Sequence, residues 1–372
     1  MLRKFTLSLM ILLILCGVSS ADFIYMTEKG NLGTLRINSS YDIETPSSLY
    51  SRNISSPLLT SYWNSSSTNL LLIDRYGSAS GDRGYIFNPS ALDNFTESHD
   101  IPGVYGTEFA GYSESGYSIF LTAGTKIFEV STSSFTIKNS FDCERIMSRD
   151  GYETEICTLH VDSSTVQVLL KAGDSIKYAR FDGQLKSNVK SFLSADMQPG
   201  ASVIMSTYTS RPFVGHSKGI DTMRNNGKFY QIISTDHPVK AICPDEGSGM
   251  FFAEQQTSGD KYINSIWHYL PSGTSYFTPF EIESSSPNIK LLRDTSNNET
   301  FAAMTNERII IVTYKNGETT TREYSASALG GTPAGITTAT VAGYDPNKSS
   351  SGCDSFGALI FVAVIPFLMK RK

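Results

Sequence analysis

Seven tight turns at nearly even spacing limit the possible fold of this chain more than any other feature. They fall at Asn38, Asn88, Ser131, Asp182, Asn225, Pro271 and Lys315, with successive gaps of 50, 43, 51, 43, 46 and 44 residues. Four carry explicit turn residues: Phe181-Asp182-Gly183, Asn225-Asn226-Gly227, Pro271-Ser272-Gly273 and Lys315-Asn316-Gly317. A four-stranded propeller blade has a period of about 40 to 50 residues. Each turn is therefore predicted to join the third and fourth strand of one blade.

Helical periodicity is nearly absent between the two ends of the chain. The segments between turns are short and rich in Tyr, Phe, Val, Ile and Thr, as in Leu70–Ile73 and Ile309–Val312. A lone blade cannot form a core, whereas a closed ring buries both faces of every blade. The chain is therefore predicted to be all-β, a seven-bladed β-propeller with short helical segments only at its two ends. A β-sandwich array and a six- or eight-bladed ring are the alternatives.

The strand count predicts how the ring closes. The last unit holds four strands, at 289–293, 300–305, 308–314 and 319–325, and the first unit holds three, at 23–28, 33–37 and about 43–50. One strand-like segment, 336–342, is left over. We expect it to supply the innermost strand of the first blade, because this removes two open sheet edges. The propeller domain is then expected to span residues 22–344.

One short sequence segment links the chain to a known propeller class. Lys126-Ile127-Phe128-Glu129-Val130-Ser131-Thr132 combines a strand with the turn that follows it. It resembles the strand-and-turn phrase of the YVTN and WD40-like propellers. The resemblance implies a ring of degenerate repeats and carries no particular activity with it.

Residues 1–21 have the layout of a secretory signal peptide. Arg3 and Lys4 precede an apolar stretch from Leu7 to Val18, and Ser19-Ser20-Ala21 supplies the small residues of a cleavage site. We expect cleavage after Ala21 or one residue earlier, and hence export. The alternatives are an uncleaved N-terminal helix and a lipoprotein signal at Cys16, although the residue before Cys16 is not small.

The chain ends in a tail with three parts. Ser349-Ser350-Ser351-Gly352-Cys353 precedes an apolar run from Phe356 to Met369, and Lys370-Arg371-Lys372 ends the chain. The apolar run is shorter than the roughly 20 residues of a transmembrane helix, and Pro366 interrupts it. A short segment broken by proline is typical of a transient signal. A plain membrane anchor through 356–369 is the alternative.

These tail residues resemble bacterial Synergist-type C-terminal sorting signals, which are related to the GlyGly-type signals that rhomboid-like intramembrane proteases read. The resemblance implies cleavage near Gly352 and Cys353, with Cys353 as a site of modification, and transfer to the cell surface. It divides the C-terminal part into a flexible tether at 345–352 and a sorting or membrane segment at 353–372. A rhomboid-type sorting protease is then an expected partner, and the protein is expected to stay attached to the membrane of the cell envelope until it is processed.

The charge balance restricts the class of partner. The chain has 31 Lys and Arg against 36 Asp and Glu, which gives a formal net charge of −5. No run of basic residues occurs between the two ends, so nucleic acid is not an expected partner. Ser, Thr, Gly, Asn and Tyr are frequent instead, as is usual on the surface of an exported all-β protein.

Cysteine and histidine residues give little sign of catalysis. Cys143 and Cys157 lie 14 residues apart, and on adjacent strands they could form a disulfide in an oxidising compartment. Cys243 has no obvious partner and is expected in the core. The five histidines lack metal-ligand spacing, although His216 and His237 could meet across a blade. No catalytic residue, metal or cofactor is predicted.

Two further groups of residues have both a structural and a functional interpretation. Asp74-Arg75-Tyr76-Gly77, together with Asp82, is an oxygen-rich loop of the kind that binds calcium, yet hairpin turns favour Asp for conformational reasons alone. Trp267 and His268 are neighbours that would either line a binding face or pack between blades. The sequence leaves both questions open.

Three functions are compatible with these features. The first is an exported, surface-sorted binding or scaffold module whose loops recognise an envelope protein or a polysaccharide. The second is an exported propeller enzyme, such as a lyase, a glycan hydrolase or a quinone-type dehydrogenase, with convergent acidic or His residues at the channel mouth. The third is a structural component of a surface layer. A propeller fold by itself selects none of the three.

Overall fold

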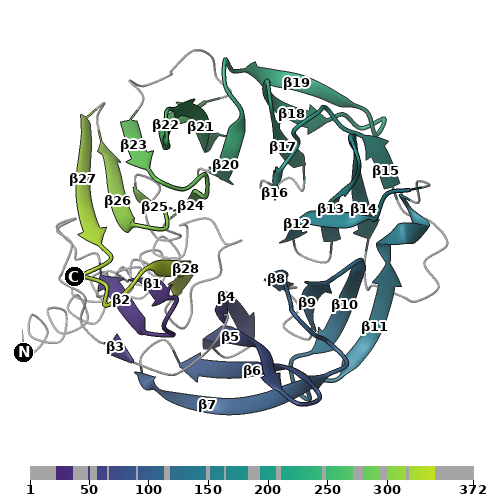
Figure 1. Cartoon of the computed structure of the whole chain (residues 1–372), viewed down its shortest axis with the longest axis vertical. Helices are drawn as coiled ribbons and strands as arrows, with labels where there is room; N and C mark the ends of the chain where they lie inside the picture. Colours follow the sequence, from purple (N-terminus) through teal and green to yellow (C-terminus); the bar gives the residue numbers. More distant parts are fainter. Residues whose placement is uncertain are drawn as a thin grey trace, which may run out of the picture.

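A computed structural model of the protein describes residues 22–36, 49–50, 57–64, 67–88, 91–112, 118–147, 151–162, 165–182, 193–206, 211–244, 249–270, 280–293, 300–315 and 318–339. These residues form seven four-stranded antiparallel sheets around a central axis (Figure 1). The protein is thus an all-β, seven-bladed propeller, which confirms the prediction from the turn spacing.

The strands of each blade follow one another from the centre of the ring outward. Blade 1 contains β28 (Pro333–Ala339), β1 (Asp22–Thr27), β2 (Leu32–Arg36) and β3 (Leu49–Tyr50). Blade 2 contains β4 (Pro57–Asn64), β5 (Ser67–Ser78), β6 (Gly81–Asn88) and β7 (Ala91–Pro102). Blade 3 contains β8 (Phe109–Tyr112), β9 (Ser118–Ala123), β10 (Lys126–Ser131) and β11 (Ile137–Asp142). Blade 4 contains β12 (Glu155–Asp162), β13 (Thr165–Ala172), β14 (Ser175–Asp182) and β15 (Leu193–Asp196).

The last three blades have the same outward order. Blade 5 contains β16 (Val203–Ser206), β17 (Pro212–His216), β18 (Gly219–Met223) and β19 (Phe229–Ser234). Blade 6 contains β20 (Val239–Pro244), β21 (Met250–Ser258), β22 (Lys261–Tyr269) and β23 (Phe280–Ser284). Blade 7 contains β24 (Lys290–Arg293), β25 (Thr300–Met304), β26 (Arg308–Lys315) and β27 (Glu318–Ser325). The predicted turns at Asn88, Ser131, Asp182, Asn225 and Lys315 each fall at the end of a third strand or just after it. The predicted turns at Asn38 and Pro271 lie outside the described residues.

The ring closes as the strand count predicts. β28 pairs antiparallel with β1, from Asp22↔Ala339 to Thr27↔Pro333, so the closing strand begins three residues before the predicted 336. The Lys290 Nζ donates to the Ile336 carbonyl oxygen over 3.1 Å, which connects blade 7 to the closing strand. Ile336 is fully buried in the cluster between these two blades. The last described strand, β28, thus completes the first blade (Figure 1).

The core consists of clusters between adjacent blades. Consecutive residues of one strand pack into two different clusters, because side chains alternate between the faces of a sheet. In β5, Leu70 and Leu72 pack toward blade 1, whereas Leu71 and Ile73 pack toward blade 3, and all four are fully buried. This is why the second strands are continuously apolar in the sequence and do not alternate with polar residues.

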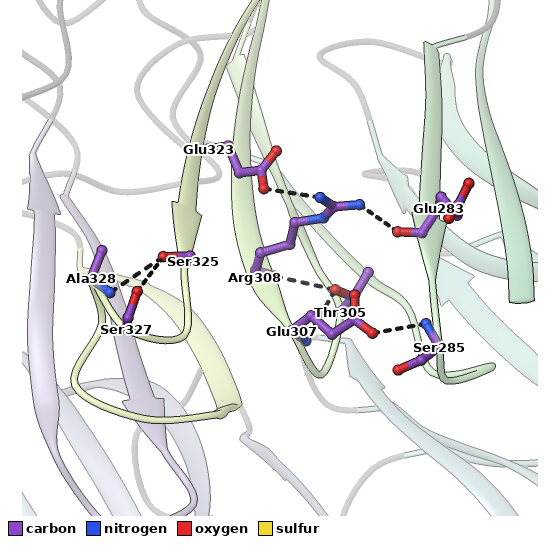
Figure 2. A network of polar contacts seen from close by, with 9 residues as sticks. All are labelled: Glu283, Ser285, Thr305, Glu307, Arg308, Glu323, Ser325, Ser327 and Ala328. Carbon is purple, nitrogen blue, oxygen red and sulfur yellow. Dashed lines mark hydrogen bonds and ion pairs between the residues drawn. The ribbon is translucent and has the colours of Figure 1, made fainter.

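Polar contacts also connect the blades. Arg308 of β26 donates from Nη1 to the Glu323 carboxylate on β27 over 2.9 Å and from Nη2 to the Glu283 carbonyl oxygen of blade 6 (Figure 2). The Ser285 amide in turn donates to the Glu307 carboxylate over 3.0 Å. The turn between β25 and β26 is therefore fixed to the preceding blade as well as to its own.

Helical structure differs slightly from the prediction. One 3-10 helix, η1 (Cys143–Arg145), lies in the connection between β11 of blade 3 and β12 of blade 4 and not at an end of the chain, and the Asp142 carboxylate accepts from the Glu144 amide over 3.1 Å. The predicted signal peptide, the tether at 345–352 and the segment at 353–372 lie outside the described residues. No helix within the described ranges has the length and apolar character needed to cross a membrane.

Candidate functional site

The predicted processing residues Ala21, Gly352 and Cys353 lie outside the described residues. The predicted disulfide is not formed: Cys143 and Cys157 are both free thiols. Cys143 is buried beside Ile156 between blades 3 and 4, whereas Cys157, the next residue on β12, packs between blades 4 and 5. The two clusters lie on opposite faces of the blade 4 sheet, so the sheet separates the two sulfurs. Burial raises the pKa of Cys143 to about 12 and that of Cys157 to about 11, which makes both thiols poor nucleophiles.

The oxygen-rich loop near Asp82 is an internal anchor. The fully buried Asp82 carboxylate accepts hydrogen bonds from the amides of Tyr76 (2.9 Å), Gly106 (2.8 Å) and Thr107 (2.7 Å), and from the Thr107 hydroxyl (2.6 Å). These hydrogen-bond donors occupy the carboxylate oxygens that would otherwise coordinate a calcium ion. Asp82 therefore holds the connection between β7 and β8 against blade 2.

His216 and His268 both have contacts that explain them as structural residues. The buried His216 accepts at Nδ1 from the Lys218 amide over 3.2 Å, so its Nε2 donates to Asp221 over 3.1 Å. His268 stacks on Phe251, with ring centroids 4.2 Å apart. Within the described ranges, no group of three or more His, Cys, Asp or Glu is placed to hold a metal ion.

His160 on β12 provides a pH-dependent test of the fold. Burial lowers the pKa of its imidazole to about 4. The unfolded chain binds a proton near pH 6.5 and the folded protein does not, so stability is expected to fall as the pH drops from about 6.5 to 4, by on the order of 2 kcal/mol. Urea unfolding at pH 7 and pH 4.5 measures this loss. The His160→Gln variant should lose less stability over that interval, and an equal loss in both proteins would contradict the assignment.

A pocket with a volume of about 250 Å³ lies between blades 5 and 6. Register brings its walls together, because Phe252 of β21 is directly opposite Trp267 of β22, and Glu254 lies two residues along the same face as Phe252. The remaining wall is Ile233 to Asp236, at the end of β19 and in the connection to β20.

Glu254 is the central polar group of this pocket. Its side chain is only 8% exposed. One carboxylate oxygen accepts from the His237 amide over 2.6 Å, and the other accepts from the Trp267 indole Nε1 over 3.1 Å. These donors orient the carboxylate and the indole relative to each other. Among the described residues, no Lys, Arg or His side chain forms a salt bridge with Glu254.

Trp267 and His268 thus answer the question that the sequence left open. Trp267 packs on the cluster between blades 5 and 6 and lines the pocket, whereas His268 faces blade 7 through its stacking on Phe251. Nothing in the sequence identifies Glu254 as a site residue. A single Glu among the polar and apolar residues of a strand stands out only once the strand register is known.

Comparison with known proteins gives the fold and no family. No family model and no curated protein matches the chain. Among solved structures, it is similar to a functionally unknown protein from Desulfotomaculum acetoxidans, with a TM-score of 0.55 and 10% identity over 87% of this chain and 100% of the other. A protein from Lactobacillus plantarum has a TM-score of 0.52 and 11% identity over 86% and 100% of the two chains. A dihydro-heme d1 dehydrogenase has a TM-score of 0.49 and 8% identity over 85% and 74%.

Proposed function

We propose that the protein is an exported, non-enzymatic binding module that holds an envelope protein through a basic side chain of that partner. The observation that carries this proposal is the Glu254 carboxylate, which is buried beside an open cavity and has no cationic partner among the described residues. Buried carboxylates are normally paired with a cation, because desolvation of the lone charge is costly.

The pocket has the chemistry of an ammonium or guanidinium receptor. Each oxygen of Glu254 accepts one hydrogen bond and retains a second lone pair for a ligand. Trp267 contributes an aromatic ring, which attracts cations through its π face. Ile233 and Phe252 are apolar and suit the methylene stem of a long side chain, while the exposed Asp236 adds a second negative charge at the rim.

The size of the pocket favours a side chain over a free cofactor. Sites for small molecules are usually about 300–1,000 Å³. The volume of about 250 Å³ is below this range. A lysine or arginine side chain presented by a larger partner fits the pocket and leaves the partner's backbone outside, on the rigid surface of the disc. This arrangement supports recognition of a protein.

The proposal is tested by isothermal titration with a short peptide that carries one lysine. The Glu254→Gln variant keeps the shape of the side chain and removes its charge, so binding should weaken at least tenfold, or about 1.4 kcal/mol. The matched control is Glu281→Gln, which removes an exposed carboxylate from β23 of the same blade and should bind like the unaltered protein. Acetylation of the peptide lysine should abolish binding to the unaltered protein and to Glu281→Gln. Equal affinity for acetylated and free lysine would refute the proposal.

We further propose that the two ends of the chain act as its sequence indicates, with removal of residues 1–21 and processing at Gly352-Cys353 by a rhomboid-type protease. The signal-like and tail-like patterns in the sequence support this route to the cell surface. Mass spectrometry of the protein purified from envelope fractions should find termini near residue 22 and near residue 352. Recovery of a species with both ends intact as the main product would contradict the proposed route.

A further inference from the structure

A second pocket of about 380 Å³ lies at the other end of the β18–β19 hairpin. It is lined by Arg211, Arg224, Asn225, Asn226 and Tyr230. Strand pairing assembles it from distant positions in the sequence. β17 pairs with β18 so that Phe213 is opposite Thr222, and Arg211 before β17 therefore comes next to Arg224 after β18.

The turn that carries Arg224 is held in one conformation. The Arg224 amide donates to the Lys228 carbonyl oxygen over 2.9 Å, and the Gly227 amide donates to the Arg224 carbonyl oxygen over 3.0 Å. The Lys228 amide also donates to the Asn226 side-chain oxygen over 3.1 Å. Gly227 has a φ of 78°, which suits glycine. Little conformational entropy remains to be lost when a ligand binds this turn.

The guanidinium groups are available to a ligand. Both arginines are exposed, and neither has an ion-pair partner among the residues that the structure describes. The Arg224 guanidinium lies over the Tyr230 ring, 4.4 Å from its centroid, which fixes its position while leaving its N–H groups at the edge free to donate. On a chain with a net charge of −5, this pocket is a local site of positive charge.

We propose that this pocket binds a carboxylate-bearing sugar of an acidic polysaccharide. The planar fork of an arginine donates two parallel hydrogen bonds to a carboxylate. The two asparagine amides can donate to and accept from sugar hydroxyl groups. The volume lies within the usual range for small-molecule sites, unlike that of the Glu254 pocket.

An acidic peptide suits the pocket less well than a sugar. Peptide recognition usually places an apolar or aromatic anchor in a buried pocket. The one aromatic ring that lines this pocket, that of Tyr230, has a face covered by Arg224. The other four lining residues are polar or charged. The two pockets lie at opposite ends of one hairpin, so a protein bound at one and a polysaccharide bound at the other would be bridged by blade 5.

The test uses isothermal titration of the 372-residue chain with oligogalacturonate, the same oligomer in its methyl-esterified form, a poly-glutamate peptide and inorganic phosphate. Oligogalacturonate should bind, with an affinity that falls as salt is raised, and the esterified oligomer should not. Arg211→Gln and Arg224→Gln should each weaken binding at least fivefold, and the double variant at least twentyfold. Lys228→Gln removes a like charge from the same turn outside the pocket and should change affinity less than twofold. Circular dichroism confirms that each variant is folded.

The proposal would be overturned by equal binding of the esterified oligomer, or by equal or tighter binding of poly-glutamate or phosphate. An equal loss of affinity in Lys228→Gln and Arg224→Gln would also overturn it. Glu254→Gln should bind oligogalacturonate normally, which keeps this test independent of the proposed protein partner. A loss in Glu254→Gln equal to that in Arg224→Gln would place the ligand elsewhere and also overturn the assignment.

Discussion

Ending the chain after Thr332 is expected to abolish cooperative unfolding of the propeller. This truncation removes β28 and leaves β1 as the innermost strand of blade 1, with an unpaired edge facing the ring. Phe23, Tyr25 and Met26 of β1 are fully buried, and the cluster that contains Phe23 and Tyr25 also loses Ile336. The cost is expected to reach the whole stability of a typical domain, about 5–15 kcal/mol. Thermal unfolding followed by circular dichroism measures it.

A chain that ends after Tyr344 is the matched control. It keeps β28 and lacks only the predicted tether and tail, so its thermal midpoint should lie within about 3 °C of that of the full-length chain. This control also tests the predicted end of the propeller domain at residue 344. A cooperative transition at an unchanged midpoint in the chain that ends after Thr332 would mean that closure through β28 contributes little.

The second large effect is expected from Asp82→Ala. The substitution leaves the amides of Tyr76, Gly106 and Thr107 without their shared acceptor. Each unsatisfied buried donor costs about 1–3 kcal/mol, and water entering the space recovers part of this loss, so we expect destabilisation of about 3–5 kcal/mol. Urea unfolding measures the change, with a lower midpoint and an unaltered dependence on urea concentration.

Asp100→Ala is the control for this prediction. Asp100 lies on β7 of the same blade and forms an exposed ion pair with Arg83, 2.7 Å between Oδ1 and Nε. Exposed pairs of this kind contribute little to stability, so the urea midpoint should not change measurably. If Asp82→Ala loses no more stability than Asp100→Ala, the buried carboxylate is not the anchor that its geometry indicates.

Local sequence patterns predicted the architecture because each blade is specified by neighbouring residues. The turns at Asn225 and Lys315 separate a third from a fourth strand within a few tens of residues. The closing strand follows from the strand count, because the segment 336–342 has no partner strand within its own unit. The count succeeded because a ring leaves no strand unpaired.

The same patterns failed for Cys143 and Cys157. Fourteen residues of separation suggested adjacent strands, but whether two side chains meet also depends on which face of the sheet each one occupies. Ile156 and Cys143 share one side of blade 4, and Cys157 takes the other. A shift in register between Ile156 and Thr158 occurs at this very position, and no sequence rule predicts it.

The amino-acid sequence by itself determined the strand content, the seven-fold repeat and the way in which the ring closes, because these follow from turn residues and apolar runs that are local in the chain. Only the tertiary structure decided which residues line the two pockets. Glu254 meets the His237 amide and the Trp267 indole across an interface between blades, and Arg211 meets Arg224 across a strand pair. Such sites depend on register and on blade packing, which bring together residues that no sequence spacing relates.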